Sequence, residues 1–307
     1  METKLVRIAE ISATSKHPIF TSVYHLINED MLKQCHKELD GNKAVGIDKV
    51  TKDEYGKNLD RNIKELVQRL KNKSFKPLPS LRVYIPKGNG KKRPLGIASY
   101  EDKIVQMAVK KILGAIYEPR FLNCMYGFRP NRGGREAIKE VYQRISYGKI
   151  SYIVDADIKG FFDHIDHDWM MKFLEWNIQD KNLLWLIRKY LKAGIMEQGK
   201  FEPTEEGSAQ GSVMSPMLAN IYMHHVLTLW FKLVVQREMQ GECFLVNFAD
   251  DFVAGFQYKS EAERYYKELK ERMEKFGLEL ESSKSRLIEF GRFAEQNRRA
   301  RGECKPE

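Results

Sequence analysis

Hydrophobic positions recur at helical spacing along several stretches of the chain. Apolar residues three or four apart form one stripe on a helix, and that stripe can pack against a core. This spacing predicts mostly helix over residues 21–75, with breaks at Gly41-Asn42 and at Gly46. Further helices are expected over residues 101–117, 182–191 and 261–276, from about residue 169, and from Ser215-Pro216 onward. The helix over 261–276 is expected to end at Gly277.

Short apolar or alternating runs between these helices predict strands. Residues 81–86 alternate and precede Gly88-Asn89-Gly90, a strong hairpin turn, so residues 94–97 are the expected returning strand. A buried strand is expected over 152–157, a hairpin over 243–256 with two aspartates in its turn, and two last strands near 278–280 and 286–290. Residues 202–210 are expected to form a loop, and the polar tail from residue 292 to be loose. This order predicts an α+β fold whose antiparallel sheet carries helices on one face.

Composition limits the class of protein. The chain has 307 residues, 42% of them hydrophobic, which is enough for one large domain or two lobes. A mean hydropathy of -0.52 and the lack of an 18-residue apolar run argue against a membrane span. The first ten residues are charged, so no signal peptide is expected. The net charge of +10 favours a polyanionic partner.

The cysteines indicate neither a zinc site nor a disulfide framework, because Cys35, Cys124, Cys243 and Cys304 lie far apart and form no CxxC pair. A reduced, cytoplasmic protein is therefore expected.

Three acids are the main candidates for chemistry. Asp157 ends a predicted strand, and Asp250 and Asp251 occupy a predicted turn between two apolar strands. Like charges repel at a partly buried site, and a divalent cation would remove that cost. Mg²⁺ binds few carboxylates and keeps water or phosphate oxygens as its other ligands. Asp155 points the same way as Asp157 by strand alternation, so periodicity alone does not separate the two.

Three segments occur in the order and rough spacing of reverse transcriptase motifs A, B and C. They are Asp157-Ile158-Lys159-Gly160-Phe161-Phe162-Asp163, Ala209-Gln210-Gly211-Ser212-Val213-Met214-Ser215-Pro216 and Phe248-Ala249-Asp250-Asp251. The chain resembles the reverse transcriptase of group II intron-encoded proteins, the maturase type, and the resemblance covers about residues 21–291. Phe248 stands where the commoner form of the motif has Tyr.

The resemblance implies the roles of the acidic residues. Asp157 and Asp250 would bind two Mg²⁺ ions, for which Mn²⁺ is a substitute, together with the backbone carbonyl of Ile158. Asp251 would be a supporting acid or a weaker ligand. Lys284 matches the lysine of motif D, which would stabilise or protonate the leaving pyrophosphate.

The resemblance also implies the nucleotide and nucleic-acid contacts. Phe162 matches the ring that excludes a 2′-hydroxyl, and Gln210 and Gly211 would contact the incoming nucleotide. Arg82 and Lys87 are candidates for the triphosphate. Candidates for RNA backbone contacts are Lys91, Lys92, Arg93, Arg129 and Arg132, although a solvated basic turn explains the first three equally well.

The expected architecture is the fingers and palm of a polymerase hand with the thumb absent. The expected division is an N-terminal extension and fingers over 1–98, palm over 99–172, a fingers insertion over 173–205, palm over 206–291, and a tail over 292–307 towards a missing thumb. The expected partners are intron RNA, an RNA template, a DNA primer and deoxynucleoside triphosphates, with no membrane. A homodimer is left open.

The leading hypothesis is an RNA-directed DNA polymerase within a bacterial intron-encoded protein that also assists splicing and intron mobility. One alternative is an RNA-binding maturase module whose polymerase site is unused, and another is a retron or diversity-generating reverse transcriptase. His164, Asp166, His167 and Asp168 resemble a hydrolase metal site, but their spacing also suits the start of a helix. We favour the helix start.

Overall fold

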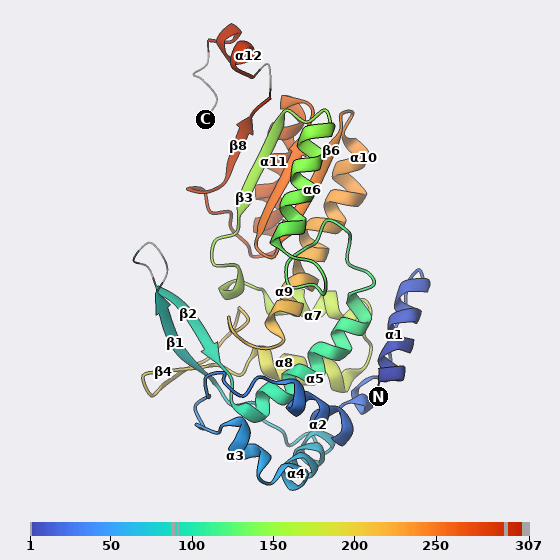
Figure 1. The fold of residues 1–307 in the computed structure, drawn as a ribbon, viewed down its shortest axis with the longest axis vertical. Coiled ribbons are helices and arrows are strands. Elements are labelled where there is room, and N and C mark those ends of the chain that lie inside the picture. The colour runs from blue at the N-terminus through green and yellow to red at the C-terminus, as the bar shows by residue number, and fades with distance from the viewer. Residues whose placement is uncertain (1, 87–89, 91, 292–293, 303–307) are drawn as a thin grey trace. The chain divides into compact units, whose positions relative to one another are not determined.

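The computed structural model describes residues 2–86, 90, 92–291 and 294–302. These residues form two compact units, which the chain enters in alternation (Figure 1). Unit 1 comprises Met1–Arg120 and Phe162–Leu218, and unit 2 comprises Phe121–Phe161 and Ala219–Glu307. Helices and strands occur in both units, which confirms the predicted α+β class.

The helices of unit 1 pack around α5, whose side chains at Ile104, Val105, Ala108 and Ile112 are fully buried. The helices are α1 Glu2–Thr14, α2 Glu29–Glu38, α3 Lys52–Gly56, α4 Leu59–Lys71, α5 Tyr100–Tyr117, α7 His167–Glu175 and α8 Lys181–Leu191, with a short 3₁₀ turn η1 Tyr24–Leu26. The predicted helices over 101–117 and 182–191 are confirmed as α5 and α8. Helix α1 was not predicted; it packs on α5, and Ser12 donates a hydrogen bond to the Ile116 carbonyl.

Unit 1 also contains a four-stranded sheet in the order β2-β1-β4-β5. Strands β1 Ser80–Pro86 and β2 Lys92–Ile97 pair antiparallel, as predicted for this hairpin. Strand β4 Ile195–Glu197 runs parallel to β1 and forms its own hairpin with β5 Lys200–Glu202. These two strands were not predicted, because three residues are too few to show a period of two.

A buried carboxyl, Asp102, ties the start of α5 to the strand and helix beside it. Its oxygens accept hydrogen bonds from the Leu78 backbone N–H at 3.1 Å, from the Ser99 hydroxyl at 2.6 Å and from the Tyr190 hydroxyl at 3.1 Å. The pKa of Asp102 is raised to about 6, because the effect of burial exceeds the opposing effect of these hydrogen bonds. The network fixes where β1 begins relative to α5 and α8.

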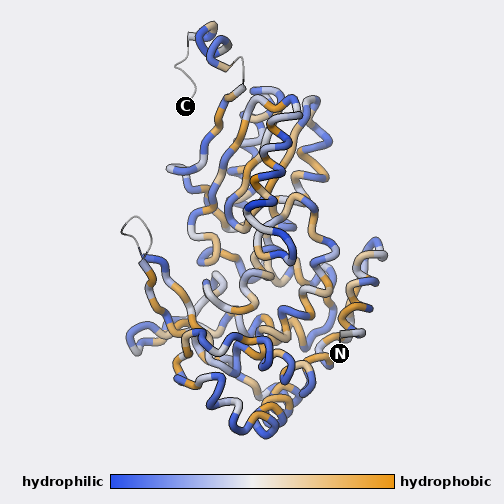
Figure 2. Tube along the Cα trace, viewed as in Figure 1, coloured by the Kyte–Doolittle hydropathy of each residue, from blue (hydrophilic) through white to orange (hydrophobic). Residues whose placement is uncertain are grey.

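Unit 2 is built on an antiparallel sheet in the order β6-β7-β3-β8. The strands are β3 Tyr152–Asp157, β6 Cys243–Phe248, β7 Asp251–Phe256 and β8 Arg286–Glu289. They confirm the predicted strand over 152–157 and the hairpin over 243–256, and hydrophobic residues dominate them (Figure 2). The strand predicted over 278–280 is reduced to an isolated bridge between Leu280 and Ile158.

Helices cover both faces of this sheet, so the prediction of helices on one face is wrong. Helix α6 Gly134–Tyr147 packs over Ile153, Phe244 and Val246, which point to one face. Helix α11 Lys259–Lys275 packs on the other face, where the Tyr265 ring lies 4.9 Å from the ring of Phe256. Helix α6 was not predicted, because its exposed Ile138 (71%) and Tyr142 (64%) blur the apolar stripe that faces the core.

A long helical segment follows the loop over residues 203–214. It runs through α9 Ser215–Met223, two π-helical stretches at His224–Thr228 and Phe231–Val235, and α10 Gln236–Glu238. Within the described residues, this is the one helical segment whose length and composition would allow it to cross a membrane. Its mean hydropathy reaches 1.2 over an 18-residue window. Because 72% of that window is buried inside the protein, a core helix explains it equally well. The tail expected to be loose contains helix α12 Ala294–Ala300.

Candidate active site

The turn between β6 and β7 carries two aspartates. The strands pair up to Phe248 opposite Asp251, which leaves Ala249 and Asp250 as the two turn residues. Ala249 has a φ of 59°, a left-handed conformation that costs energy for a residue with a side chain. Buried Asn247 supports this conformation from inside, because its Nδ2 donates to the carbonyl oxygens of Ala249 at 2.8 Å and Asp251 at 3.4 Å.

A second segment of unit 2 clamps the same turn. The Tyr126 N–H donates to the Asn247 carbonyl at 2.8 Å, and the next residue, Gly127, lies against the turn backbone. A Cβ at Gly127 would lie 3.1 Å from the Ala249 Cα and closer than 3.0 Å to the Ala249 nitrogen, which real Cβ atoms essentially never do. Buried Asn220 of α9 donates from Nδ2 to the Gly127 carbonyl at 2.8 Å. A glycine is therefore required here for close approach.

The strand register brings the third aspartate beside this turn. Asp157 at the end of β3 is the direct partner of Asp251 on β7, so both side chains point to the same face of the sheet. Asp155 is paired with Val253, and this pair lies two residues further from the turn along each strand. Register therefore makes the distinction between Asp155 and Asp157 that periodicity did not.

A loop from unit 2 closes around the end of β3. The Glu281 N–H donates to the Asp157 carbonyl at 2.8 Å, and the Asp157 N–H donates to the Ser285 hydroxyl at 3.3 Å. Lys284 forms an ion pair with the Asp157 carboxylate, and the hydrogen bond to that carboxylate raises the pKa of Lys284. The Lys284 side chain is 58% exposed, whereas that of Asp157 is 13% exposed. The lysine therefore reaches a mostly buried carboxylate from solvent.

The backbone at Ile158 is oriented by the same loop. Ile158 bridges Leu280, and the flanking bonds run from Lys159 N–H to the Glu279 carbonyl at 2.9 Å and from Glu281 N–H to the Asp157 carbonyl. In such a bridge the N–H and C=O of the bridged residue point away from the partner. The Ile158 carbonyl is thus directed towards the side of β3 on which β7 and its aspartates lie.

The negative charges of the neighbouring carboxylates affect the pKa of Asp251. The pKa of Asp251 is raised, first by partial desolvation of its carboxyl and then by the negative charges of Asp250 and Asp157. Oxygen donors in such a cluster suit a hard divalent cation, which would relieve the repulsion. As the side chains stand, no group of three or more His, Cys, Asp or Glu in the described part of the chain could hold a metal ion. The ammonium of Lys284 supplies the positive charge at Asp157 instead.

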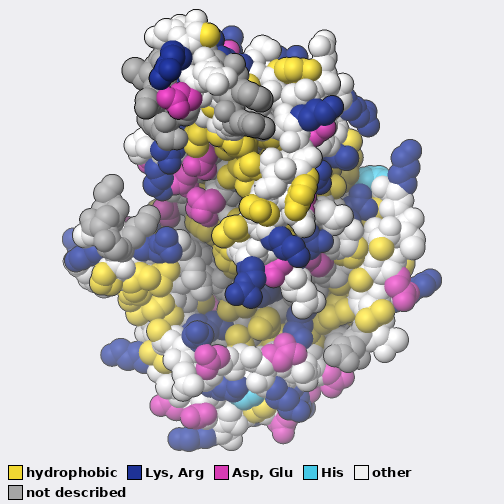
Figure 3. Space-filling model, turned by 45° about the horizontal axis from the view of Figure 1, so that its top comes forward, with side chains coloured by type: hydrophobic (Ala, Val, Ile, Leu, Met, Phe, Trp, Pro, Cys, Tyr) yellow, Lys and Arg dark blue, Asp and Glu magenta, His cyan; other side chains and the backbone are white. Residues whose placement is uncertain are grey.

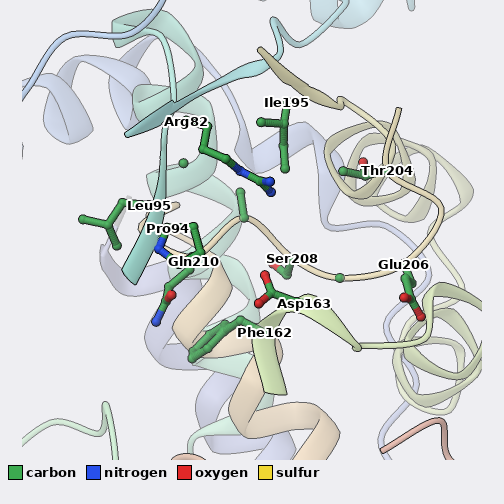
Figure 4. A pocket seen from close by; sticks show the side chains of 13 residues that line it. Arg82, Pro94, Leu95, Phe162, Asp163, Ile195, Thr204, Glu206, Ser208 and Gln210 are labelled. Atoms are coloured by element: carbon green, nitrogen blue, oxygen red, sulfur yellow. The ribbon is translucent and has the colours of Figure 1, made fainter. Parts of the chain in front are cut away.

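Unit 1 contains a separate pocket of about 260 Å³. Figure 4 shows Arg82 reaching into it from β1, with the Phe162 ring and the Gln210 side chain on the opposite side. The Arg82 guanidinium lies 3.5 Å from the Glu197 carboxylate and 3.8 Å from that of Glu202. Phe162 is partly exposed, whereas its neighbour Phe161 is 1% exposed, so Phe161 is the core residue of the two.

The loop that carries Gln210 is fixed by backbone and side-chain hydrogen bonds. The Gly96 N–H of β2 donates to the Gln210 carbonyl at 2.7 Å. Buried Gln106 of α5 accepts from the Ser212 hydroxyl and from the Val213 N–H, each at 3.1 Å. Gly211 has a φ of 106°, which a residue with a side chain rarely adopts.

Comparison with known families agrees with the predicted motifs. The sequence profile of the family described as reverse transcriptase (RNA-dependent DNA polymerase) matches residues 85–300. The chain belongs to the reverse transcriptase family. This span includes both the two-aspartate turn with Asp157 and the loop that carries Gln210.

Relatives of this chain confirm the resemblance to intron-encoded proteins. The group II intron-encoded protein LtrA of Lactococcus lactis subsp. cremoris is 37% identical over 76% of this chain and 39% of its own length. An uncharacterized 91 kDa protein in a cob intron of Schizosaccharomyces pombe is 36% identical over 66% of this chain and 25% of its own length. The chain thus spans less than half of these relatives.

A solved structure of another protein has a similar fold, and this similarity is found from structure and not from sequence. Telomerase from Candida albicans, in complex with a fragment of telomeric RNA, matches 71% of this chain and 42% of its own with a TM-score of 0.52. The sequence identity is 13%, so this likeness concerns the fold alone.

The basic residues proposed to contact RNA differ in their surroundings in the structure. Lys87 and Lys91 lie outside the described residues, whereas Lys92 and Arg93 are exposed on β2. Arg129 donates to the carbonyl oxygens of Leu122 at 2.9 Å and Met125 at 3.1 Å, and Arg132 donates to that of Asn123 at 2.9 Å. Both arginines therefore brace their own segment, and their contact with RNA stays a prediction.

Several residues that position the site were not singled out from the sequence. Asn247, Gly127, Ser285 and Gln106 act on the backbone of the acids or of the Gln210 loop. Asn247 could have been identified from the sequence, because it is a polar residue within an otherwise apolar, buried strand. Gly127, Ser285 and Gln106 could not be identified in this way, because the residues that they contact lie far away in the sequence.

Proposed function

We propose that this chain is the catalytic core of an RNA-directed DNA polymerase that adds deoxynucleotides to the 3′-hydroxyl of a primer. The observation that carries this proposal is the pairing of Asp157 with Asp251 beside the Asp250 turn, in a chain of the reverse transcriptase family. Nucleotidyl transfer needs little covalent chemistry from the protein, which mainly positions groups and neutralises charge. The arrangement of acids and Lys284 suits that task.

The carboxylates of Asp157 and Asp250 and the carbonyl of Ile158 would hold two Mg²⁺ ions, or Mn²⁺ in their place, with Asp251 as a supporting acid. When bound, such ions stabilise negative charge on the attacking and leaving oxygens. Lys284 would then exchange its contact with Asp157 for the charge of the leaving pyrophosphate. While it contacts Asp157, the hydrogen bond to that carboxylate raises the pKa of Lys284, so the side chain enters this exchange as an ammonium that can neutralise the charge of the pyrophosphate.

Residues of the unit 1 pocket would select the nucleotide. The partly exposed Phe162 ring would exclude a 2′-hydroxyl, and Gln210 and Gly211 would contact the nucleotide. Arg82 would bind phosphate, and Lys87 remains a candidate for the same role. For Arg82 this requires that phosphate replace the carboxylates of Glu197 and Glu202, with which it now pairs.

In polymerase terms, we assign residues 1–98 and 173–205 to fingers and residues 99–172 and 206–291 to palm. The antiparallel sheet with its two-aspartate turn supports the palm assignment.

The proposed nucleic-acid partners are an RNA template, a DNA primer and a group II intron RNA whose splicing and mobility the protein assists. The names of the relatives support the intron, since they include a group II intron-encoded protein and a nuclear intron maturase. The net charge of +10 supports a polyanion. Lys and Arg side chains are spread over the face drawn in Figure 3, interspersed with acidic and hydrophobic ones. A bacterial cytoplasm is the proposed location.

Primer extension tests this function. The full-length chain of 307 residues is given an RNA template, an annealed DNA primer, deoxynucleotides and Mg²⁺. We expect full-length protein to extend the primer in a template-dependent way and to stop when the divalent ion is chelated. Tight RNA binding without any extension would instead favour an RNA-binding maturase with an unused polymerase site.

A further inference from the structure

A buried histidine contacts the loop that leads to Gln210. His167, the first residue of α7, is 6% exposed, and its Nε2 lies 2.6 Å from the carbonyl oxygen of Gly207. A carbonyl oxygen only accepts hydrogen bonds, so Nε2 must carry the proton. The other ring nitrogen, Nδ1, is buried and has no hydrogen-bond partner among the described residues. Within the part of the chain that the structure describes, the ring's one hydrogen bond is therefore the one to Gly207.

This contact belongs to a set of bonds that join residues 162–167 to residues 206–208. The Gly207 N–H donates to the Ile165 carbonyl at 2.8 Å, and the Ser208 N–H donates to the Phe162 carbonyl at 2.7 Å. Gly207 is thus held on both sides, by its N–H and by its C=O. The next residue along the chain, Ser208, holds the backbone of Phe162.

The position of the Phe162 ring depends on this backbone. Because the ring is only partly buried, packing alone fixes it less firmly than it fixes Phe161. Phe162, Ser208 and Gln210 all line the unit 1 pocket (Figure 4). A shift of Gly207 would move Ser208, which also lines the pocket, and would weaken the hydrogen bond that holds the Phe162 backbone.

We propose that His167 is a positioning residue for discrimination between deoxyribose and ribose. By holding the Gly207 carbonyl, it sets the distance between the Phe162 ring and the wall of the pocket against which a sugar would lie. This inference rests on the proposed function, in which Phe162 excludes a 2′-hydroxyl. His167 itself does not touch the nucleotide.

The test compares two variants of matched length in the full-length protein. In H167Q the side-chain amide can still donate to Gly207, whereas H167M has a similar length and no donor. The quantity measured is kcat/KM for a deoxynucleotide divided by kcat/KM for the matching ribonucleotide. We expect H167M to lower this ratio by about 5- to 100-fold, the range for a lost buried hydrogen bond, and H167Q to stay near wild type.

The neighbouring His164 provides a control. It lies in the same segment, but its Nδ1 lies 3.3 Å from the exposed Glu206 carboxylate, so its contact is with a side chain and not with the loop backbone. H164A should leave the ratio unchanged. If H167M does not fold, H167N replaces it, because its amide is one methylene too short to reach the carbonyl.

The outcomes separate this inference from the proposed function. A purely structural role of His167 would lower kcat/KM for both nucleotides by the same factor, and that result would overturn the inference. F162A should itself lower the ratio. If F162A has no effect, the assignment of Phe162 fails; if F162A lowers the ratio and H167M does not, only the role of His167 fails.

Discussion

Asp250→Asn and Asp157→Asn should each reduce nucleotide addition by at least about a thousandfold while leaving RNA binding close to wild type. Each change keeps the shape of the side chain and removes one negative charge from the cluster beside the β6–β7 turn. A neutral amide is a poor ligand for a hard divalent cation. Single-turnover primer extension measures the first effect, and RNA binding at fixed salt measures the second.

Asp155→Asn is the matched control for these two variants. Asp155 lies on the same strand and points to the same face as Asp157, but it faces Val253 and lies 3.9 Å from Arg286. We expect its replacement to change the rate only a few fold. Rapid extension by the Asp250 or Asp157 variant, or an equal loss in the Asp155 variant, would contradict the assignment of these acids.

Gly127→Ala should have the second largest effect, although residue 127 carries no chemistry. The added methyl group would overlap the backbone nitrogen of Ala249, so the turn that carries Asp250 must move. Overpacking of this kind costs about 1–3 kcal/mol of stability. We expect a loss of extension activity larger than the loss of stability explains, measured by primer extension beside thermal unfolding.

Gly134→Ala controls for the general effect of replacing a glycine in this segment. Gly134 begins α6, and a Cβ there would meet nothing within 4 Å. Alanine is favoured over glycine in a helix by up to about 1 kcal/mol, so this variant should be at least as stable as wild type and fully active. Unchanged activity in Gly127→Ala would show that the turn tolerates displacement and that the clamp is not required.

Much of the fold could be predicted from periodicity. The strands over 152–157 and 243–256 and the helices α5 and α8 have strong apolar patterns and were found where expected. Helix α6 and the short β4–β5 hairpin were missed. In α6, exposed Ile138 and Tyr142 interrupt the contrast between faces, and in β4 only three residues pair. The pattern of hydrophobic positions does not predict an element whose position is set by contacts with distant parts of the chain.

The candidate site divides in the same way. The candidate residues lie in short sequence motifs, so Asp157, Asp250, Phe162 and Gln210 could be named from the sequence. The supports of these residues could not, since Gly127 lies more than a hundred residues before Ala249, and Ser285 lies equally far beyond Asp157. The resemblance to motif A selected Asp157 over Asp155, and the strand register now pairs Asp157, not Asp155, with Asp251. The roles of the named residues remain predictions.

The central claim is that Asp157 and the Asp250 turn together hold divalent cations. The most direct measurement is anomalous scattering from crystals of the full-length protein grown with template, primer, an unreactive nucleotide and Mn²⁺. We predict Mn²⁺ bound to oxygens of both Asp157 and Asp250 at about 2.0–2.3 Å, with Lys284 moved off Asp157. Ordered Mn²⁺ found only elsewhere, with the Lys284–Asp157 pair intact, would contradict the claim.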